Sequence, residues 1–152
     1  MIIGVIADTH GLLRPEVFEL FKGVSLIIHA GDIGKPDVLS ILRKVAPVRA
    51  VRGNVDKGAW ADSVPSTDVV EVNDRFIYLL HDLNTLDLDP AAAGMQAVIS
   101  GHSHRPGESR KYGVLYLNPG SAGPRRFKLP ITAALLRIEE SGEITWKVHE
   151  IA

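Results

Sequence analysis

Residues 2–10 have the sequence Ile-Ile-Gly-Val-Ile-Ala-Asp-Thr-His, an apolar run that ends in two side chains able to bind a metal ion. The run Ile2–Ala7 is rich in isoleucine and too short for a helix, so it predicts a buried strand. Asp8 and His10 come directly after it, and alternate residues of an extended chain point to the same side. This stretch therefore predicts a strand that delivers metal ligands from its carboxyl end.

Four further short apolar runs have the same arrangement. They predict buried strands at Leu26–Ala30, Val48–Val51, Phe76–Leu80 and Ala97–Ile99. The polar side chains that follow these runs are Asp32, Asn54, His81, His102 and His104. Because ligands of open α/β sheets bind outside the carboxyl ends of the strands, we expect all of these side chains to meet in one site.

Helices and additional strands complete the predicted fold. Prolines at a first helical position and broad apolar faces predict helices at Pro15–Lys22 and Pro36–Val45, and Asp89-Pro90-Ala91 is a candidate start for a short helix. The additional strands are Val69–Val72, Val114–Leu117, Ile131–Ile138 and Ile144–Val148. Alternation of strand and helix in the first half implies parallel pairing. We predict an α/β protein with two β-sheets and helices outside them.

Length and composition limit what the chain can be. Its 152 residues suffice for one domain and are few for two, so we expect a single domain over residues 1–152. The absence of cysteine excludes disulfide scaffolds, thiolate metal sites and cysteine nucleophiles. A net charge of −1 does not favour a broad nucleic-acid or membrane surface. No apolar run approaches the roughly 20 residues of a membrane span, so we expect a cytoplasmic protein.

The candidate ligands outnumber what one tetrahedral ion needs. They are Asp8, His10, Asp32, Asn54, His81, His102 and His104. This set suits two divalent ions of higher coordination number, with a second oxygen of Asp32 available as a bridge. Mixed imidazole and oxygen ligands favour Mn, Fe, Zn, Co or Ni over Mg or Ca. We expect two divalent transition metal ions, with manganese as the first choice.

In this order and spacing, the five blocks resemble the signature of the calcineurin-like metallophosphoesterases. The blocks are Asp8-x-His10, Gly31-Asp32, Gly53-Asn54, His81 and Gly101-His102-x-His104. Together with the compact length, the later segment Asn118-Pro119-Gly120-Ser121 resembles the small bacterial and archaeal phosphodiesterase branch of the family. The resemblance covers nearly the whole chain. It implies a pair of mixed β-sheets packed face to face and flanked by helices, an αββα sandwich.

The resemblance also implies the roles of the residues. One ion would take Asp8, His10, Asp32 and His104, and the other would take Asp32, Asn54, His81 and His102. A hydroxide bridging the two ions would attack the phosphoester directly, with no covalent enzyme intermediate. Asp32, Asn54 and His102 are the candidate catalytic residues. Asn54, Arg125 and Arg126 are candidates to contact the substrate phosphate, with a solvated basic loop as an equal alternative for the two arginines.

Two positions depart from the wider family pattern. Many members carry a histidine after the Gly-Asn pair, but this chain has Val55, which cannot donate a proton. General acid catalysis is typically worth about 10²–10⁴-fold, so the departure favours diesters or activated esters over alkyl monoesters. A glycine commonly follows the fourth-block histidine, whereas Asp82 follows His81 here. A clash, a supporting contact and added charge near the site all remain open for Asp82. Another histidine, His29, lies inside an apolar run and is expected to be buried with its hydrogen bonds satisfied.

Other functions compete with a phosphodiesterase that acts on a small, nucleotide-like phosphoester. A non-catalytic metal-binding scaffold resembling the retromer subunit of this fold is one of them, although the complete ligand set speaks against it. A nuclease or cyclic-nucleotide phosphodiesterase is another, and the net charge of −1 argues against a nucleic-acid partner. Small members of the family often associate, so a homo-oligomer stays open.

Overall fold

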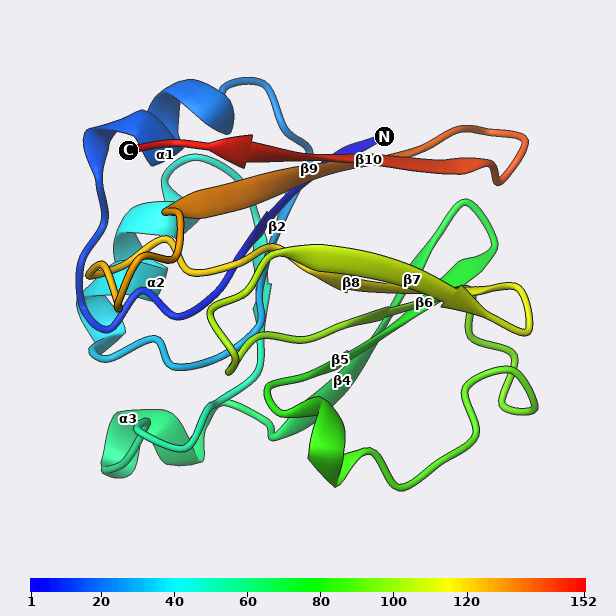
Figure 1. Ribbon diagram of the computed structural model, residues 1–152, viewed down its shortest axis with the longest axis horizontal. Helices are drawn as coiled ribbons and strands as arrows, with labels where there is room; N and C mark the ends of the chain where they lie inside the picture. Colours follow the sequence, from blue (N-terminus) through cyan, green and yellow to red (C-terminus); the bar gives the residue numbers. More distant parts are fainter.

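The computed structural model describes all residues, 1–152, and contains ten strands in two five-stranded sheets (Figure 1). The first sheet has the order β10-β9-β1-β2-β3. Its strands are β1 (Ile2–Ile6), β2 (Leu26–His29), β3 (Val48–Ala50), β9 (Thr132–Ile138) and β10 (Ile144–Glu150). The strands β1, β2 and β3 are parallel, joined through α1 (Pro15–Leu20) and α2 (Pro36–Arg43), and β9 is antiparallel to both β1 and β10.

The second sheet has the order β4-β5-β6-β8-β7. Its strands are β4 (Thr67–Val72), β5 (Arg75–Leu80), β6 (Ala97–Ile99), β7 (Gly107–Lys111) and β8 (Val114–Asn118). The three central strands β5, β6 and β8 are parallel, while β4 and β7 are antiparallel edge strands. Both sheets are mixed, which confirms the predicted fold.

The two sheets pack face to face around a core of 17 buried residues. Ile3, Val5 and Ile28 of the first sheet meet Leu79 and Ile99 of the second sheet in this core. Their alternation along β1 follows from the period of two residues in a strand. Burial of these branched side chains is the main contribution that holds the sheets together.

Helices cover only the outer face of the first sheet, where α1 and α2 are gathered on one side of the molecule (Figure 1). Val17 and Phe21 from the α1 segment and Leu39 and Leu42 from α2 pack there in a second cluster of 13 buried residues. The outer face of the second sheet is covered instead by the connection between β5 and β6, through Leu86, Leu88 and Met95. The flanking helices that the resemblance implied are therefore present on one face only.

The predicted short helix at Asp89-Pro90-Ala91 was wrong. The segment forms a turn, in which the Ala93 N–H donates to the Asp89 carbonyl (2.9 Å) and the Met95 N–H donates to that of Pro90 (2.9 Å). Gly94, with a φ of +82°, leaves the helical conformation and ends the turn after a few residues.

Three short elements were not predicted at all: β7, α3 (Ala59–Asp62) and the 3-10 helix η1 (Leu83–Thr85). All five residues of β7 are exposed, so the strand has no apolar pattern and exists through its pairing with β8. The other two elements, of four and three residues, are too short to show a helical period. None of the helices in the structure is long and apolar enough to cross a membrane.

Candidate metal centre

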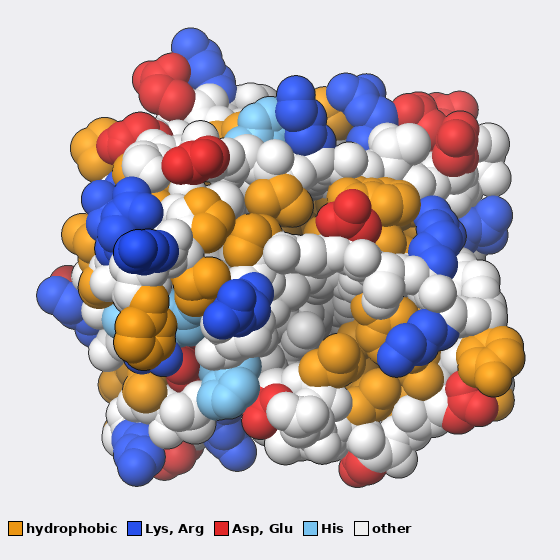
Figure 2. All heavy atoms as spheres, in the orientation of Figure 1, with side chains coloured by type: hydrophobic (Ala, Val, Ile, Leu, Met, Phe, Trp, Pro, Cys, Tyr) orange, Lys and Arg blue, Asp and Glu red, His pale blue; other side chains and the backbone are white.

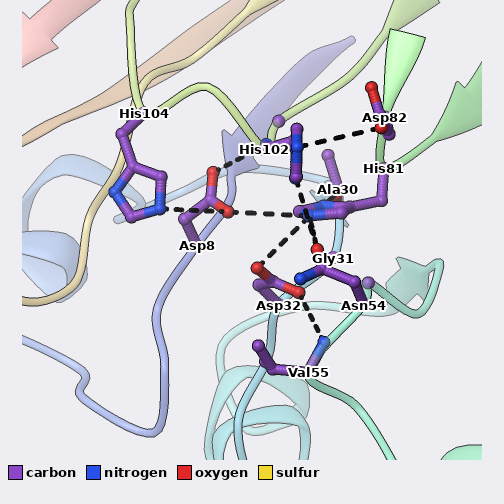
Figure 3. Close-up of polar contacts among 12 residues, drawn as sticks. Asp8, Ala30, Gly31, Asp32, Asn54, Val55, His81, Asp82, His102 and His104 are labelled. Atoms are coloured by element: carbon purple, nitrogen blue, oxygen red, sulfur yellow. Dashed lines mark hydrogen bonds and ion pairs between the residues drawn. The ribbon is translucent and has the colours of Figure 1, made fainter. Parts of the chain in front are cut away.

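All seven predicted ligands lie in one site, at the carboxyl ends of β1, β2, β3, β5 and β6. Figure 3 shows the side chains of Asp8, Asp32, Asn54, His81, His102 and His104 directed toward one another. Two sheets therefore contribute to a single centre, as the strand ends predict. Figure 2 shows histidine side chains at the surface of this face, with Lys and Arg side chains around them.

One group of ligand atoms comes from Asp8, His10 and His104, and each of its atoms lies within 4.8 Å of the others. Nε2 of His104 is 3.6 Å from Oδ1 of Asp8, and Nε2 of His10 is 3.6 Å from Oδ2 of Asp32. Two ligands that share one ion through bonds of about 2.1 Å lie roughly 3.0–3.4 Å apart. The observed distances are slightly longer than this range.

A second group surrounds His81. Its Nε2 is 3.3 Å from Oδ2 of Asp32 and 3.1 Å from Oδ1 of Asn54, and Oδ1 of Asn54 is 3.3 Å from Nδ1 of His102. Oδ2 of Asp32 thus faces His10 on one side and His81 on the other. Asp32 lies between the two groups, where a bridging carboxylate would lie. Asp8 is not remote from the second group, because its Oδ1 is 3.9 Å from Nε2 of His81.

The site gathers acceptor atoms that lack donors. Nδ1 of His81 contacts the Ala30 carbonyl at 2.8 Å, and donation to this oxygen would leave Nε2 of His81 free to bind an ion once it has lost its own proton. Oδ1 of Asp8 and Nε2 of His10 are buried and have no hydrogen-bond partner. Oxygen and nitrogen lone pairs held this close repel one another unless a cation lies between them. The residues present therefore fit divalent metal ions.

The two carboxylates differ in their ionisation. Burial raises the pKa of Asp8 to about 7, although the charge of His81 partly opposes the rise. Burial also disfavours the charged form of Asp32, but hydrogen bonds from His81 and from the Val55 N–H (3.1 Å) outweigh it and hold the pKa of Asp32 below its usual value. In the absence of metal, Asp32 is thus the more acidic of the pair.

A chain of hydrogen bonds behind the site fixes the ends of β1 and β2. The Gly31 N–H donates to Nδ1 of His29 (3.1 Å), so Nε2 of this ring carries the proton and donates to Oγ1 of Thr9 (3.0 Å). The hydroxyl of Thr9 then donates to the Ile33 carbonyl (2.8 Å). Burial lowers the pKa of His29 to about 3, so the ring is neutral. His29 is buried and satisfied, as predicted, and it holds the chain on both sides of the two carboxylates.

The backbone at the site is strained. Five of the predicted ligands have left-handed φ values: Asp8 (54°), His10 (48°), Asp32 (54°), His102 (73°) and His104 (62°). Such conformations cost about 1–3 kcal/mol each and gather at functional sites. Gly53 leaves the space they need, because a Cβ there would collide with Oδ1 of Asp32.

The arginines differ in what they do. Arg125 donates to the carbonyls of Leu129 (3.1 Å) and Ala152 (3.4 Å), so it supports its own loop. The charge of Arg126 lies close enough to the site to lower the pKa of Asp8 and of His104, although burial is the larger influence on both. The structure therefore gives different roles to Arg125 and Arg126, which the sequence could not distinguish.

The sequence left the roles of two residues undecided: Asp82, and Asp56, for which a plain turn residue and a hydrogen-bond partner near the site were equal alternatives. Asp82 stands where many family members have a glycine after the fourth-block histidine, and its Oδ2 lies 3.8 Å from Nε2 of His102. Asp56 accepts hydrogen bonds from the N–H groups of Ile33 (3.1 Å), Gly34 (2.9 Å) and Gly53 (2.8 Å), which ties the loops after β2 and β3 together. The contacts of Asp56 with Ile33 and Gly34 join residues more than 20 positions apart, so the sequence could not decide between the two roles of Asp56.

Replacing Asp8 by asparagine is expected to stabilise the metal-free protein at alkaline pH. The pKa of Asp8 is about 7 in the folded chain and 3.8 in its ordinary state, so the penalty of ionising it sets in as the pH rises above 3.8 and is complete above 7. At pH 8 in chelator, Tm of Asp8→Asn should exceed that of the wild type by several degrees, since about 1 kcal/mol shifts Tm by roughly 2–4 °C for this size. At pH 4 the gain should nearly vanish. A lower Tm at pH 8 would contradict the assigned ionisation.

Comparison with known proteins agrees with this geometry. Residues 1–141 match the calcineurin-like phosphoesterase superfamily domain. The chain is 36% identical over 151 residues to a probable metallophosphoesterase of Methanothermobacter thermautotrophicus, a match that covers 91% of this chain and 87% of the relative.

Solved structures show the same fold. A structure described as a novel archaeal phosphodiesterase superposes with a TM-score of 0.79 at 25% identity, covering 98% of this chain and all of the other. Vps29 from Entamoeba histolytica in complex with zinc superposes with a TM-score of 0.77 at 24% identity over the whole of both chains. The family match and the archaeal relative together show that this chain belongs to the calcineurin-like metallophosphoesterases.

Proposed function

We propose that this protein is a metal-dependent phosphodiesterase with two divalent ions in its centre. The observation that carries the proposal is the position of Asp32, whose Oδ2 lies 3.6 Å from His10 and 3.3 Å from His81 and so between two groups of ligand atoms. Membership of the metallophosphoesterase family supports the hydrolase activity. The phosphodiesterase named among the solved structures supports the choice of substrate class.

Each ion would have four protein ligands. The first would take Asp8, His10, Asp32 and His104, and the second would take Asp32, Asn54, His81 and His102. When bound, two such ions supply a strong nucleophile from water and stabilise charge on the phosphoryl oxygens. Manganese is our first choice, because imidazole, amide and carboxylate ligands suit it; Fe, Zn, Co and Ni accept the same set.

The chain's own residues bind and orient the phosphate. The side chain of His102 is 43% exposed, whereas that of His104 is only 3% exposed, so substrate reaches the centre from the side of His102 and Asn54. Arg126 adds positive charge near Asp8 and His104, which favours a negatively charged phosphoryl group there. We therefore assign catalysis to Asp32, Asn54 and His102, and phosphate binding to Asn54 and Arg126.

The site has no proton donor at position 55 for the leaving group of the substrate. Hydrolysis forms a bond from phosphorus to the oxygen of water and breaks the bond to the leaving oxygen, which must then take up a proton. Val55, which is 43% exposed beside Asn54, has no proton to give. Substrates whose leaving oxygen departs without a general acid are therefore favoured, and we propose a small phosphodiester as the natural class.

A non-catalytic metal-binding scaffold is the second candidate. The likeness to Vps29 over the full length of both chains favours it. Both candidates can bind metal, so metal content does not distinguish them. Only the phosphodiesterase would hydrolyse a substrate. Metal content and phosphodiester hydrolysis must therefore be measured on the same preparation.

The first test removes one ligand at a time. The variants Asp32→Ala and His104→Ala should lower manganese content measured by elemental analysis from two ions per chain. They should also lower kcat/KM on bis(p-nitrophenyl) phosphate by more than about 100-fold, since even the partners that support ligands are worth 10–100-fold.

His149→Ala is the matched control, because this histidine lies on β10 in the outer part of the first sheet. It should retain both metal and activity. Wild-type protein that holds two ions but hydrolyses neither a diester nor a monoester would favour the scaffold, and full activity in Asp32→Ala would refute the proposed centre.

The second test supplies the missing acid. Val55→His should raise kcat/KM for esters with poor, alkyl leaving groups by up to about 10²–10⁴-fold and change that for p-nitrophenyl esters little. Val55→Ala is the control, because it keeps the N–H bond to Asp32 without adding a proton donor. Equal gains on both kinds of ester in Val55→His would contradict the assignment of a leaving-group role to this position.

A further inference from the structure

We propose that the loop 123–130 and Arg105 form a nucleoside subsite, in which the ring of Phe127 stacks on the base of a nucleotide phosphodiester. This inference rests on the proposed function and specifies its substrate class. It draws on a strained, exposed aromatic residue, on unpaired cations beside it and on the attachment of the loop to the metal centre.

The residues at the start of the loop pack against the segment that carries the predicted ligands Asp8 and His10. The Ala122 N–H donates to the Ala7 carbonyl (3.1 Å), and the hydroxyl of Ser121 donates to the Asp8 carbonyl (3.1 Å). Gly123 packs so closely on the backbone of Asp8 and Thr9 that a Cβ would collide with it. The position of the loop relative to the centre is thus fixed at its base.

The tip of the loop presents Phe127 to solvent. The Leu129 N–H donates to the Arg126 carbonyl (3.1 Å), and this turn is held by Arg125 through the Leu129 and Ala152 carbonyls. Phe127 is 89% exposed and has a φ of +53°. A left-handed conformation is unfavourable for a bulky residue, and the exposed ring gains no burial in return. Tyr112 in the β7–β8 turn is as exposed and has a φ of +51°, so the feature that distinguishes Phe127 is its position on a loop attached to the metal centre.

The surroundings of the ring are cationic. Phe127, Lys128 and Leu129 border an open hollow of about 790 Å³ together with Arg105, which directly follows the ligand His104. The arginine and lysine ion pairs of the structure are Arg49–Asp68 and Arg137–Glu139. The charges of Arg105, Arg126 and Lys128 are therefore unpaired.

A nucleotide matches this combination. Bases stack on exposed aromatic rings with a gain of about 1–3 kcal/mol per base, whichever base it is. Arginine and lysine next to the ring attract the phosphates that join nucleosides. A sugar phosphate or an aliphatic diester would use the cations and leave Phe127 without a role. The size of the molecule and its net charge of −1 favour a mononucleotide or short diester over a long polymer.

The kinetic test compares two substrates with the same leaving group. Thymidine 5′-(p-nitrophenyl phosphate) and methyl p-nitrophenyl phosphate differ only in the group that stays on the phosphate, which is a nucleoside in the first and a methyl group in the second. Phe127→Ala should lower the ratio of their kcat/KM values by about 5–150-fold, the equivalent of losing one stacked base. Tyr112→Ala is the matched control, because Tyr112 is 94% exposed in the β7–β8 turn, and it should leave the ratio unchanged. An unchanged ratio in Phe127→Ala would overturn the subsite.

A binding test separates this inference from the proposed activity. Phe127→Trp adds a third indole to Trp60 and Trp146. AMP should quench the fluorescence of Phe127→Trp more than that of the wild type, and ribose 5-phosphate, which lacks a base, should not. Quenching by AMP without any hydrolysis would refute the phosphodiesterase and retain the subsite. Hydrolysis with no quenching would support the phosphodiesterase and refute the subsite. Equal responses to AMP and ribose 5-phosphate would mean that only the phosphate is bound, which would also refute the subsite.

A separate observation concerns Asp82. We also infer that it is a positioning residue, which keeps His102 turned with Nδ1 toward Asn54, with which it would hold the second ion. Nδ1 of His102 faces Asn54 at 3.3 Å, and Nε2 faces the Asp82 carboxylate at 3.8 Å on the outer side (Figure 3). Asp82 is itself held, because its Oδ1 accepts the Asn84 N–H (3.0 Å) and its carbonyl accepts the Thr85 hydroxyl (2.7 Å). A negative charge at Nε2 favours the proton there and leaves the lone pair on Nδ1.

The test is stepwise manganese binding measured by calorimetry. Asp82→Asn keeps the oxygen that accepts the Asn84 N–H and removes the charge. It should weaken binding of one of the two ions by about 10–100-fold and leave the other unchanged. Asp87→Asn, an exposed aspartate in the same connection, is the control, and Asp82→Glu should restore part of the affinity. Two unchanged affinities in Asp82→Asn would show that Asp82 does not act through His102.

Discussion

Two carboxylates, Asp8 and Asp32, are buried side by side where the two sheets meet. Most of the contacts around them lower the electrostatic cost of burying two like charges. A desolvated pair of like charges is unfavourable unless opposite charge or donors lie close by. The chain surrounds the pair with imidazoles, backbone N–H groups and the positive charge of Arg126. These contacts lower the cost without removing it, as the pKa of about 7 for Asp8 shows. A cation bound between the two carboxylates would remove the remaining cost.

The hydrogen-bonded framework behind the ligands makes the arrangement rigid. His29, Thr9 and Asp56 bind backbone groups on both sides of the carboxylates and leave little freedom to the loops after β1, β2 and β3. Burial keeps the pKa of His29 at about 3, so this ring stays neutral and keeps its hydrogen bonds at ordinary pH. The His29 and Thr9 part of the framework therefore holds its geometry while the groups of the site gain or lose protons.

Much of the fold and of the site could be predicted because its signals are local. Five apolar runs followed by polar residues predicted the strand ends, and parallel pairing brought those ends together. The strand β7 could not be predicted, since all its residues are exposed and only the partner strand defines it. The outward contact of Asp82 and the different roles of Arg125 and Arg126 depend on where distant segments lie. Nothing in a linear pattern of residue types reports such distances.

The left-handed backbone at five of the predicted ligands separates the needs of the metal centre from those of the fold. Glycine and asparagine adopt that conformation more readily than histidine does, so either of them at these positions would relieve strain while it removed a metal-binding group. The 17-residue core between the sheets contains none of these residues. The architecture and the chemistry of this protein can therefore be lost separately, and a chain that had given up its metal-binding side chains could keep the same two sheets.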